Sequence, residues 1–198
     1  MPVDRRDFWD GRASEFSKYA ATTGYPEEFI RILKPRMKWT VLDMACGGGT
    51  IAVPLAGRVK SITAVDFSQQ MLDIVNWRCR IGHIDNVKTL QGRWEDDWDH
   101  LGIGNHDVAI ASRSLIGDDA QGLIRKLSKV AREAVYITVA VGAGPFDKML
   151  FESSGRKFNM GQDYVNYYNI LYEMGIQANV AFIPERHRSQ WDSLEEAL

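Results

Sequence analysis

The segment 41–50 reads Val-Leu-Asp-Met-Ala-Cys-Gly-Gly-Gly-Thr, and it constrains the fold more than any other part of the chain. An apolar run ends at Asp43, three consecutive glycines follow, and the apolar pattern resumes at Ile51. Glycine tolerates backbone angles that other residues avoid, and it lets a ligand approach the main chain closely. The segment therefore predicts a buried strand that passes into a helix through a turn with almost no side chains.

Strands and helices are expected to alternate along the rest of the chain. Apolar runs predict strands at residues 40–44, 61–66, 87–91, 107–112, 134–141 and 176–183. Helical spacing predicts helices over 7–20, from Pro26, over 50–56, from Ser68, through Leu123, Leu127 and Val130, and over 145–153 and 162–174. The run 134–141 is apolar enough for burial on both faces. This alternation predicts an α/β fold with a doubly wound, mostly parallel sheet flanked by helices, and ligands at the carboxyl ends of its strands.

The chain of 198 residues suits one domain with a single large core. We expect this domain to span residues 1–183, with residues 1–36 as an N-terminal helical lid and 184–198 as a polar extension. Ser193 to Glu196 have the S-x-x-E form of a capping box, which predicts the start of a helix. Because a helix that stops so soon after its cap is not stable alone, we expect the extension to be incomplete.

Charge and cysteine content narrow the function classes. The formal net charge of −2 provides no broad basic surface, which argues against a nucleic-acid substrate. No apolar run approaches the roughly 20 residues that cross a bilayer, and no apolar signal core follows the charged N-terminus. The two cysteines, Cys46 and Cys79, build no disulfide framework, which favours a cytoplasmic location. The histidines lack ligand spacing, so no metal site is predicted.

A second acid, Asp66, ends the next predicted strand after the glycine turn. A glycine turn with an acid about 20 residues later is typical of α/β sheets that bind an adenosine nucleoside. The run 47–52 fits the G-x-G-x-x-A pattern of dinucleotide sites, which would indicate an NAD(P)-dependent oxidoreductase. Asp43 argues against it, because a carboxylate would repel a pyrophosphate at the following helix. The ammonium and sulfonium of S-adenosylmethionine would instead be stabilised by that carboxylate.

Over roughly residues 8–183, the sequence resembles the class I S-adenosylmethionine-dependent methyltransferases. The segment 41–50 is similar to their first motif, acid-x-Gly-x-Gly-x-Gly, with Ala45 where the first glycine is usual. The segment 65–72 resembles their second motif, whose acid holds the ribose hydroxyls and whose next residue lies against the adenine. The resemblance implies cofactor contacts from Asp43, Ala45, Cys46, Gly47, Gly49, Thr50, Asp66, Phe67 and Met71.

The third matching segment, Gly-Arg-Trp-Glu-Asp at 92–96, is similar to the family's Gly-Asp-Ala-Glu-Asp but lacks its first aspartate. In the family an aspartate there accepts a hydrogen bond from the adenine amino group. This chain has Arg93, and a guanidinium can only donate. Either Glu95 or backbone groups at Trp94 are expected to make the contact instead. The run 107–115 resembles the fourth motif but lacks the Asn-Pro-Pro-Tyr type signature of adenine or glutamine N-methylation.

The resemblance implies an enzyme that transfers a methyl group from S-adenosylmethionine to a small-molecule acceptor and leaves S-adenosylhomocysteine. It also implies a cofactor contact from Ser112, weak catalytic candidates in Arg113 and Ser114, and a lid contact from Tyr19. A non-catalytic S-adenosylmethionine-binding protein, such as a sensor or partner subunit, is the alternative from another class. The family completes its sheet with an antiparallel strand after the sixth, and no such strand is visible in this sequence.

Overall fold

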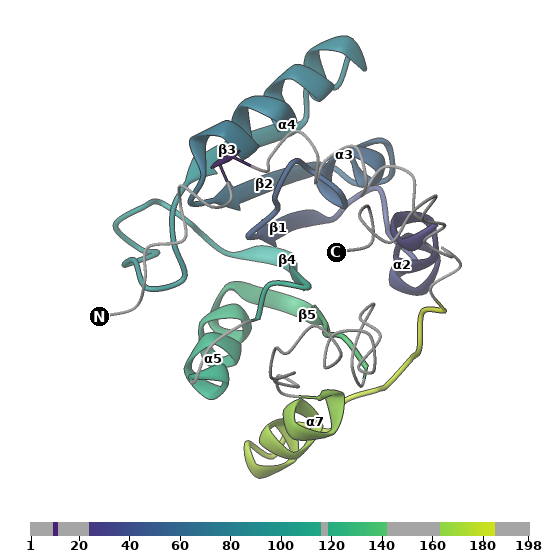
Figure 1. Cartoon of the computed structure of the whole chain (residues 1–198), viewed down its shortest axis with the longest axis vertical. Coiled ribbons are helices and arrows are strands. Elements are labelled where there is room, and N and C mark those ends of the chain that lie inside the picture. The colour runs from purple at the N-terminus through teal and green to yellow at the C-terminus, as the bar shows by residue number, and fades with distance from the viewer. Residues whose placement is uncertain (1–9, 12–23, 116–118, 142–162, 185–198) are drawn as a thin grey trace, which may run out of the picture.

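The computed structural model describes residues 10–11, 24–115, 119–141 and 163–184. Its centre is a five-stranded sheet in the order β3-β2-β1-β4-β5 (Figure 1), and every strand pair is parallel. The strands are β1 (Thr40–Met44), β2 (Ser61–Asp66), β3 (Val87–Gln91), β4 (His106–Ser112) and β5 (Ala131–Thr138). The order reverses between β1 and β4, which is the place where doubly wound sheets bind ligands. The predicted fold class is confirmed.

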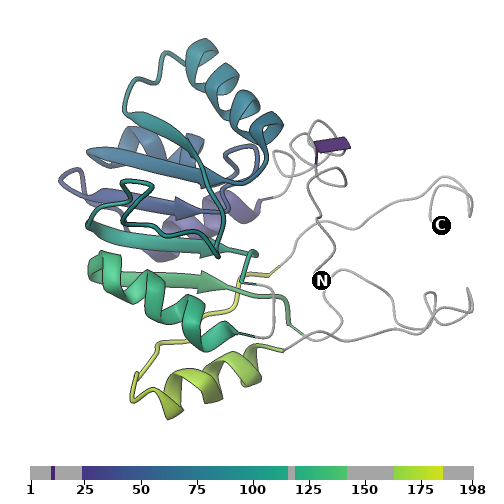
Figure 2. The ribbon, with the colours of Figure 1, turned by 90° about the vertical axis from the view of Figure 1, so that its left-hand side faces the viewer.

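Helices cover both faces of this sheet (Figures 1 and 2). They are α2 (Tyr25–Leu33), α3 (Ala52–Leu55) with a short 3₁₀ turn η1 (Ala56–Arg58), α4 (Gln69–Ile81), α5 (Ala120–Val130) and α7 (Tyr164–Glu173). Side chains cap three of them. Ser68 accepts a hydrogen bond from the Met71 amide at the start of α4, Asp119 begins α5 in the same way, and Asp163 forms a capping box at α7.

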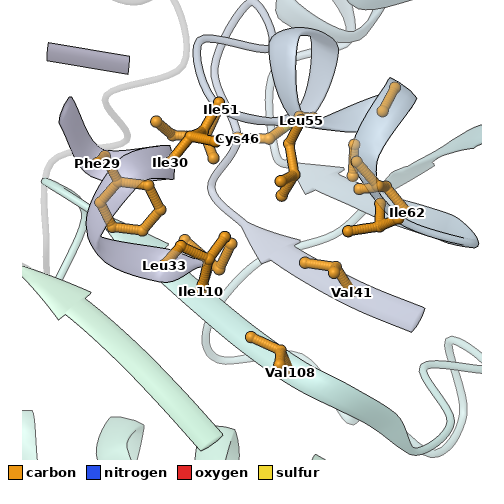
Figure 3. Close-up of a cluster of buried hydrophobic side chains, with 14 of the residues drawn as sticks. Phe29, Ile30, Leu33, Val41, Cys46, Ile51, Leu55, Ile62, Val108 and Ile110 are labelled. Atoms are coloured by element: carbon orange, nitrogen blue, oxygen red, sulfur yellow. The ribbon is translucent and has the colours of Figure 1, made fainter. Parts of the chain in front are cut away.

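Successive strand residues point to opposite faces, so the sheet separates two apolar cores. In the first core α2 and α3 pack on the sheet, and Figure 3 shows Phe29, Leu33 and Leu55 gathered with Val41 and Ile62. The second core joins alternate strand residues to α5 and α7. It includes Leu42, Val65, Ala109, Leu127 and Tyr167. The three central strands, β2, β1 and β4, are thus buried over most of their length on both faces.

The strand predicted at Ile176–Ile183 is wrong, since this segment forms no strand. Ile176 packs against the second core and Ile183 against the first. The chain therefore crosses beyond the edge of the sheet, and Figure 1 shows it running from α7 toward α2. Val180 and Phe182 are exposed on the way. Alternating apolar residues suit a strand, but a strand forms only where a neighbour takes its hydrogen bonds.

Two further elements differ from their predicted bounds, and two predicted helices lie in parts of the chain that the structure does not describe. β5 spans Ala131–Thr138 rather than 134–141, and most of its side chains are half-buried rather than buried on both faces, because within the described sheet it has only β4 as a neighbour. The helix expected over 50–56 is reduced to α3 and η1. The helices predicted over 7–20 and 145–153 lie outside the described residues, apart from Asp10 and Gly11. None of the described helices is long and apolar enough to cross a membrane.

Candidate functional site

The glycine turn adopts the backbone conformation that its sequence predicts. It follows β1 at the carboxyl edge of the sheet, and its φ angles are 55° at Ala45, 53° at Gly47 and 79° at Gly49. This left-handed region costs a residue with a Cβ about 1–2 kcal/mol, whereas glycine enters it freely. Ala45 therefore keeps the conformation of a glycine at an energetic cost, which is the kind of local strain that gathers at functional sites.

Neighbouring elements hold the turn through its backbone groups. The Cys46 amide donates to the Val65 carbonyl oxygen at 2.9 Å, which extends the pairing of β1 with β2. Arg78, half-buried on α4, donates from Nη1 to the Gly48 carbonyl oxygen at 2.7 Å. Sequence reasoning missed Arg78, because no local pattern indicates that a helical arginine reaches back across 30 residues to a turn.

Asp43, on β1 beside the turn, is only 1% exposed, and neither of its carboxylate oxygens accepts a hydrogen bond from a described residue. Burial raises the pKa of Asp43 from 3.8 to about 7, the Ala52 backbone amide opposes part of this rise, and the Asp66 carboxylate adds to it. A buried carboxylate without a partner is unfavourable unless a cation or donor reaches it. The site therefore fits a ligand that brings positive charge, such as S-adenosylmethionine.

Asp66 ends β2 and is 4% exposed. Its Oδ2 accepts from the Gly47 amide at 2.8 Å and its Oδ1 from the Ser68 amide at 3.0 Å. The pKa of Asp66 is raised, mainly by burial, although the backbone hydrogen bonds from Ser68, Gly47 and Phe67 oppose the rise and the Asp10 carboxylate adds to it. Both oxygens thus hold the backbone around the turn, and the ribose contact remains a prediction.

The N-terminal part of the chain reaches this side of the site through Asp10. Its carboxylate accepts a hydrogen bond from the Ser68 hydroxyl, which itself caps α4. In Figure 2 residues 10–11 lie on the side toward which the strand arrows point. Asp10 and Ser68 were not among the predicted cofactor residues, and a charged residue in a predicted N-terminal helix carries no signal for this contact. Tyr19 lies outside the described residues.

The loop after β3 lies beside Phe67. The Arg93 guanidinium carbon is 5.8 Å from the centroid of the Phe67 ring. Lys126 of α5 anchors the loop, since its Nζ donates to the carbonyl oxygens of Trp94 at 2.6 Å and Asp96 at 2.8 Å. The Trp94 indole nitrogen is buried and donates to no described residue. Of the other two residues predicted to contact the adenine, Met71 is buried and Glu95 is exposed to solvent.

A hydroxyl cluster lies at the ends of β4 and β5, defined by Tyr25, Ser112 and Thr138. The Tyr25 hydroxyl is 2.7 Å from both Ser112 Oγ and Thr138 Oγ1. Arg113 has a φ of 55°, and its guanidinium carbon lies 3.8 Å from the Tyr25 ring centroid. Ser114 Oγ donates to the Met44 carbonyl oxygen at 3.2 Å, which ties this loop to β1.

Tyr25 and Thr138 were missed at the sequence level. Thr138 is the register partner of Ser112, so a polar residue at the end of the neighbouring strand was a usable signal. Tyr25 carried no such signal, because its ring belongs to the apolar face of α2 and only its hydroxyl reaches the strand ends.

Neither a cysteine nucleophile nor a metal centre is supported by the described residues of this site. Burial and the neighbouring Asp43 and Asp66 carboxylates raise the pKa of the Cys46 thiol well above its ordinary value, which opposes a role as nucleophile. Across the described part of the chain, no group of three or more histidine, cysteine and acidic side chains could hold a metal ion. His106 lies at the amino end of β4 and is bound to Thr63 and Gly104.

Comparison with known proteins places this geometry in a family. Residues 41–134 match the family described as Methyltransferase domain. An uncharacterized protein of Haemophilus influenzae is 32% identical over 194 residues, which cover 96% of this chain and 71% of that protein. The 23S rRNA (uracil(1939)-C(5))-methyltransferase RlmD of Vibrio parahaemolyticus is 26% identical over 115 residues, which cover 57% of this chain but only 26% of that protein.

The fold agrees with solved methyltransferase structures. The structure of DhpI in complex with SAH superposes with a TM-score of 0.62 at 19% identity and covers 86% of this chain and 85% of DhpI. A putative methyltransferase of Bacillus halodurans superposes with a TM-score of 0.61 at 15% identity, over 76% of this chain and 68% of that one. The strand order, the glycine turn and these relatives agree, and the chain belongs to the class I S-adenosylmethionine-dependent methyltransferases.

Proposed function

We propose that this methyltransferase transfers the methyl group to a small-molecule acceptor, which approaches over the ends of β4 and β5. The observation that carries the proposal is the hydroxyl cluster with its neighbours. Small hydroxyl side chains and one buried tyrosine line this half of the strand ends, and among the described residues Arg113 places a cation beside them. A polynucleotide acceptor would need several Lys and Arg side chains for its phosphates.

The cofactor would occupy the other half of the same edge, over β1 and β2. When bound, S-adenosylmethionine supplies a methyl group activated by the sulfonium. Asp43 would neutralise the ammonium, and its lack of a described partner supports this role. Asp66 and the Gly47 and Gly49 backbone would shape the pocket for the ribose and the amino-acid part, and Phe67 and Met71 would contact the adenine.

The residues at the ends of β4 and β5 would act by alignment. Methyl transfer needs the acceptor atom held about 3–3.5 Å from the methyl carbon, and placement of this kind supplies much of the catalysis. The Tyr25 hydroxyl, fixed between Ser112 and Thr138, orients the Ser112 hydroxyl beside the place where the strand order reverses between β1 and β4. An amine, thiol or enolate acceptor would then need no dedicated base.

RNA is the second candidate acceptor, because several relatives are named RNA methyltransferases. They match about half of this chain, and this chain covers about a quarter of each. The acceptor named for these relatives therefore gives little support for RNA as the acceptor of this protein.

Labelled transfer distinguishes the two acceptors. The protein would be incubated with methyl-labelled S-adenosylmethionine and a bacterial extract, and the product would be separated by size and treated with ribonuclease. We expect label in a low-mass product that resists ribonuclease. Label in a large, ribonuclease-sensitive product would redirect the acceptor to RNA, and a signal equal to that without protein would contradict transfer.

Cofactor affinity should depend on pH through Asp43. Its pKa is raised to about 7 in the free protein, so below pH 7 the carboxyl is protonated and attracts an ammonium poorly. We expect the affinity for S-adenosylhomocysteine to fall about tenfold for each pH unit below 7, with one proton released on binding. Calorimetry in buffers of different ionisation enthalpy measures both effects.

Without ligand, the same raised pKa makes the contribution of Asp43 to the free energy of unfolding fall as the pH rises from about 4 to 7.

A further inference from the structure

We propose that Arg93 and Phe67 enclose the adenine ring of the cofactor between them, so that the base is held by stacking instead of by a carboxylate that accepts from its amino group. This inference rests on the cofactor site proposed above. It concerns Arg93, at a position where the sequence departs from its family, and it predicts a different base selectivity.

The two side chains come from neighbouring strand ends. Phe67 follows Asp66 at the end of β2, and Arg93 follows Gly92 just beyond β3. Asp66 and Gln91 are register partners in the parallel pair β2–β3, so both side chains leave the same edge of the sheet. The guanidinium carbon of Arg93 already lies over the Phe67 ring, 5.8 Å from its centroid.

Hydrogen bonds fix the backbone on both sides of this pair. Gln91 Nε2 donates to the Phe67 carbonyl oxygen at 3.1 Å, and Trp98 Nε1 donates to the Arg93 carbonyl oxygen at 3.2 Å. The Arg93 amide donates to Asp96 Oδ2 at 2.8 Å. A third planar group between two others needs a separation of about 7 Å, twice the usual contact distance. Because Arg93 Cζ lies 5.8 Å from the Phe67 centroid, a base between them requires this separation to grow by about 1–2 Å.

The chemistry of arginine fits this position better than a hydrogen bond to the amino group does. A guanidinium is planar, stacks on aromatic faces and carries a charge that attracts the π-system. It has no acceptor atom, so Arg93 cannot bond the adenine amino group. Glu95, the predicted substitute, is exposed. Because every base has a π-face, stacking recognises a planar ring but discriminates only weakly between bases that differ in the substituent at position 6.

The test compares S-adenosylhomocysteine with S-inosylhomocysteine, in which an oxygen replaces the amino group, by calorimetry on the full chain. We expect the unaltered protein to bind the two ligands within about threefold, whereas a dedicated polar contact rejects the wrong partner by several orders of magnitude. Arg93→Met should lower the affinity for both ligands by about tenfold. The affinity of Arg93→Lys should lie between those of Arg93→Met and the unaltered protein, because lysine keeps the charge but lacks the planar group. Arg93→Asp should restore a preference for the adenosine ligand of about tenfold or more.

Arg80, exposed on α4, offers the matched control, and Arg80→Met should bind both ligands as the unaltered protein does. Rejection of the inosine ligand by 100-fold or more, or unchanged affinities in Arg93→Met, would overturn the stacking proposal. An unaltered protein that bound neither ligand would contradict the cofactor site itself, so the two failures are distinguishable.

Discussion

Gly49→Ala is expected to lower the free energy of unfolding by about 2–5 kcal/mol. Gly49 has a φ of +79°, and a Cβ built on it would lie 2.7 Å from Val53 Cγ2 and 3.2 Å from Val75 Cγ2. The left-handed backbone costs an alanine about 1–2 kcal/mol, and overpacking of a full core adds about 1–3 kcal/mol. Urea unfolding followed by circular dichroism measures the loss, which is a large part of the stability of an ordinary domain.

Gly57 provides the control for this substitution. It is exposed in η1, it has no atom within 4 Å of a built Cβ, and its φ does not lie in the left-handed region. Gly57→Ala should leave the free energy of unfolding within about 0.5–1 kcal/mol of the unaltered value. If Gly49→Ala were equally mild, α3 and α4 would not pack against the turn as closely as the structure indicates.

Asp43→Asn should change stability and cofactor affinity in opposite directions. At pH 8 the free protein holds a buried, unpaired carboxylate whose pKa of about 7 lies above its ordinary 3.8, which corresponds to a penalty of up to about 4 kcal/mol. The neutral amide removes this charge, so the free protein should become more stable by about 1–3 kcal/mol. Loss of the charge partner should weaken S-adenosylhomocysteine binding by about 2–5 kcal/mol.

The pH dependence of this variant separates charge from packing. At pH 5 the Asp43 carboxyl is protonated, so the stability gain of Asp43→Asn should largely vanish there. Asp85→Asn, at an exposed position between α4 and β3, should change neither quantity. An Asp43→Asn protein that lost stability at pH 8 while keeping its affinity would show that Asp43 supports the fold rather than the cofactor.

Local pattern was enough for the parts of the fold that local forces determine. The bounds predicted for β1, β2 and β3 match those observed, because each is a short segment ended by turn residues, apolar in β1 and β2 and of mixed polarity in β3. The start of α4 at Ser68 was predicted from capping chemistry that acts within one helical turn. Prediction was wrong at 176–183, where an alternating run found no neighbour to pair with and crossed the sheet edge instead.

Some residues of the candidate site could be predicted from local sequence pattern, and others could not. The glycine turn, Asp43 and Asp66 could be located from sequence, because strand ends in a parallel sheet share one edge. Arg78, Asp10 and the hydroxyl cluster could not. Their contacts join residues 30 to 113 positions apart, and no periodicity in the sequence encodes such a pair.

The sequence by itself determined that this chain builds a glycine turn between two acids, and hence an α/β cofactor site, because backbone preference and hydrophobic periodicity act over a few residues. Only the tertiary structure decided how the charges there are used. It leaves Asp43 without a described partner, it commits Asp66 to the Gly47 and Ser68 amides, and it sets Arg93 over Phe67. Those outcomes depend on which strand ends lie side by side and on burial at that edge, which are properties of the folded sheet.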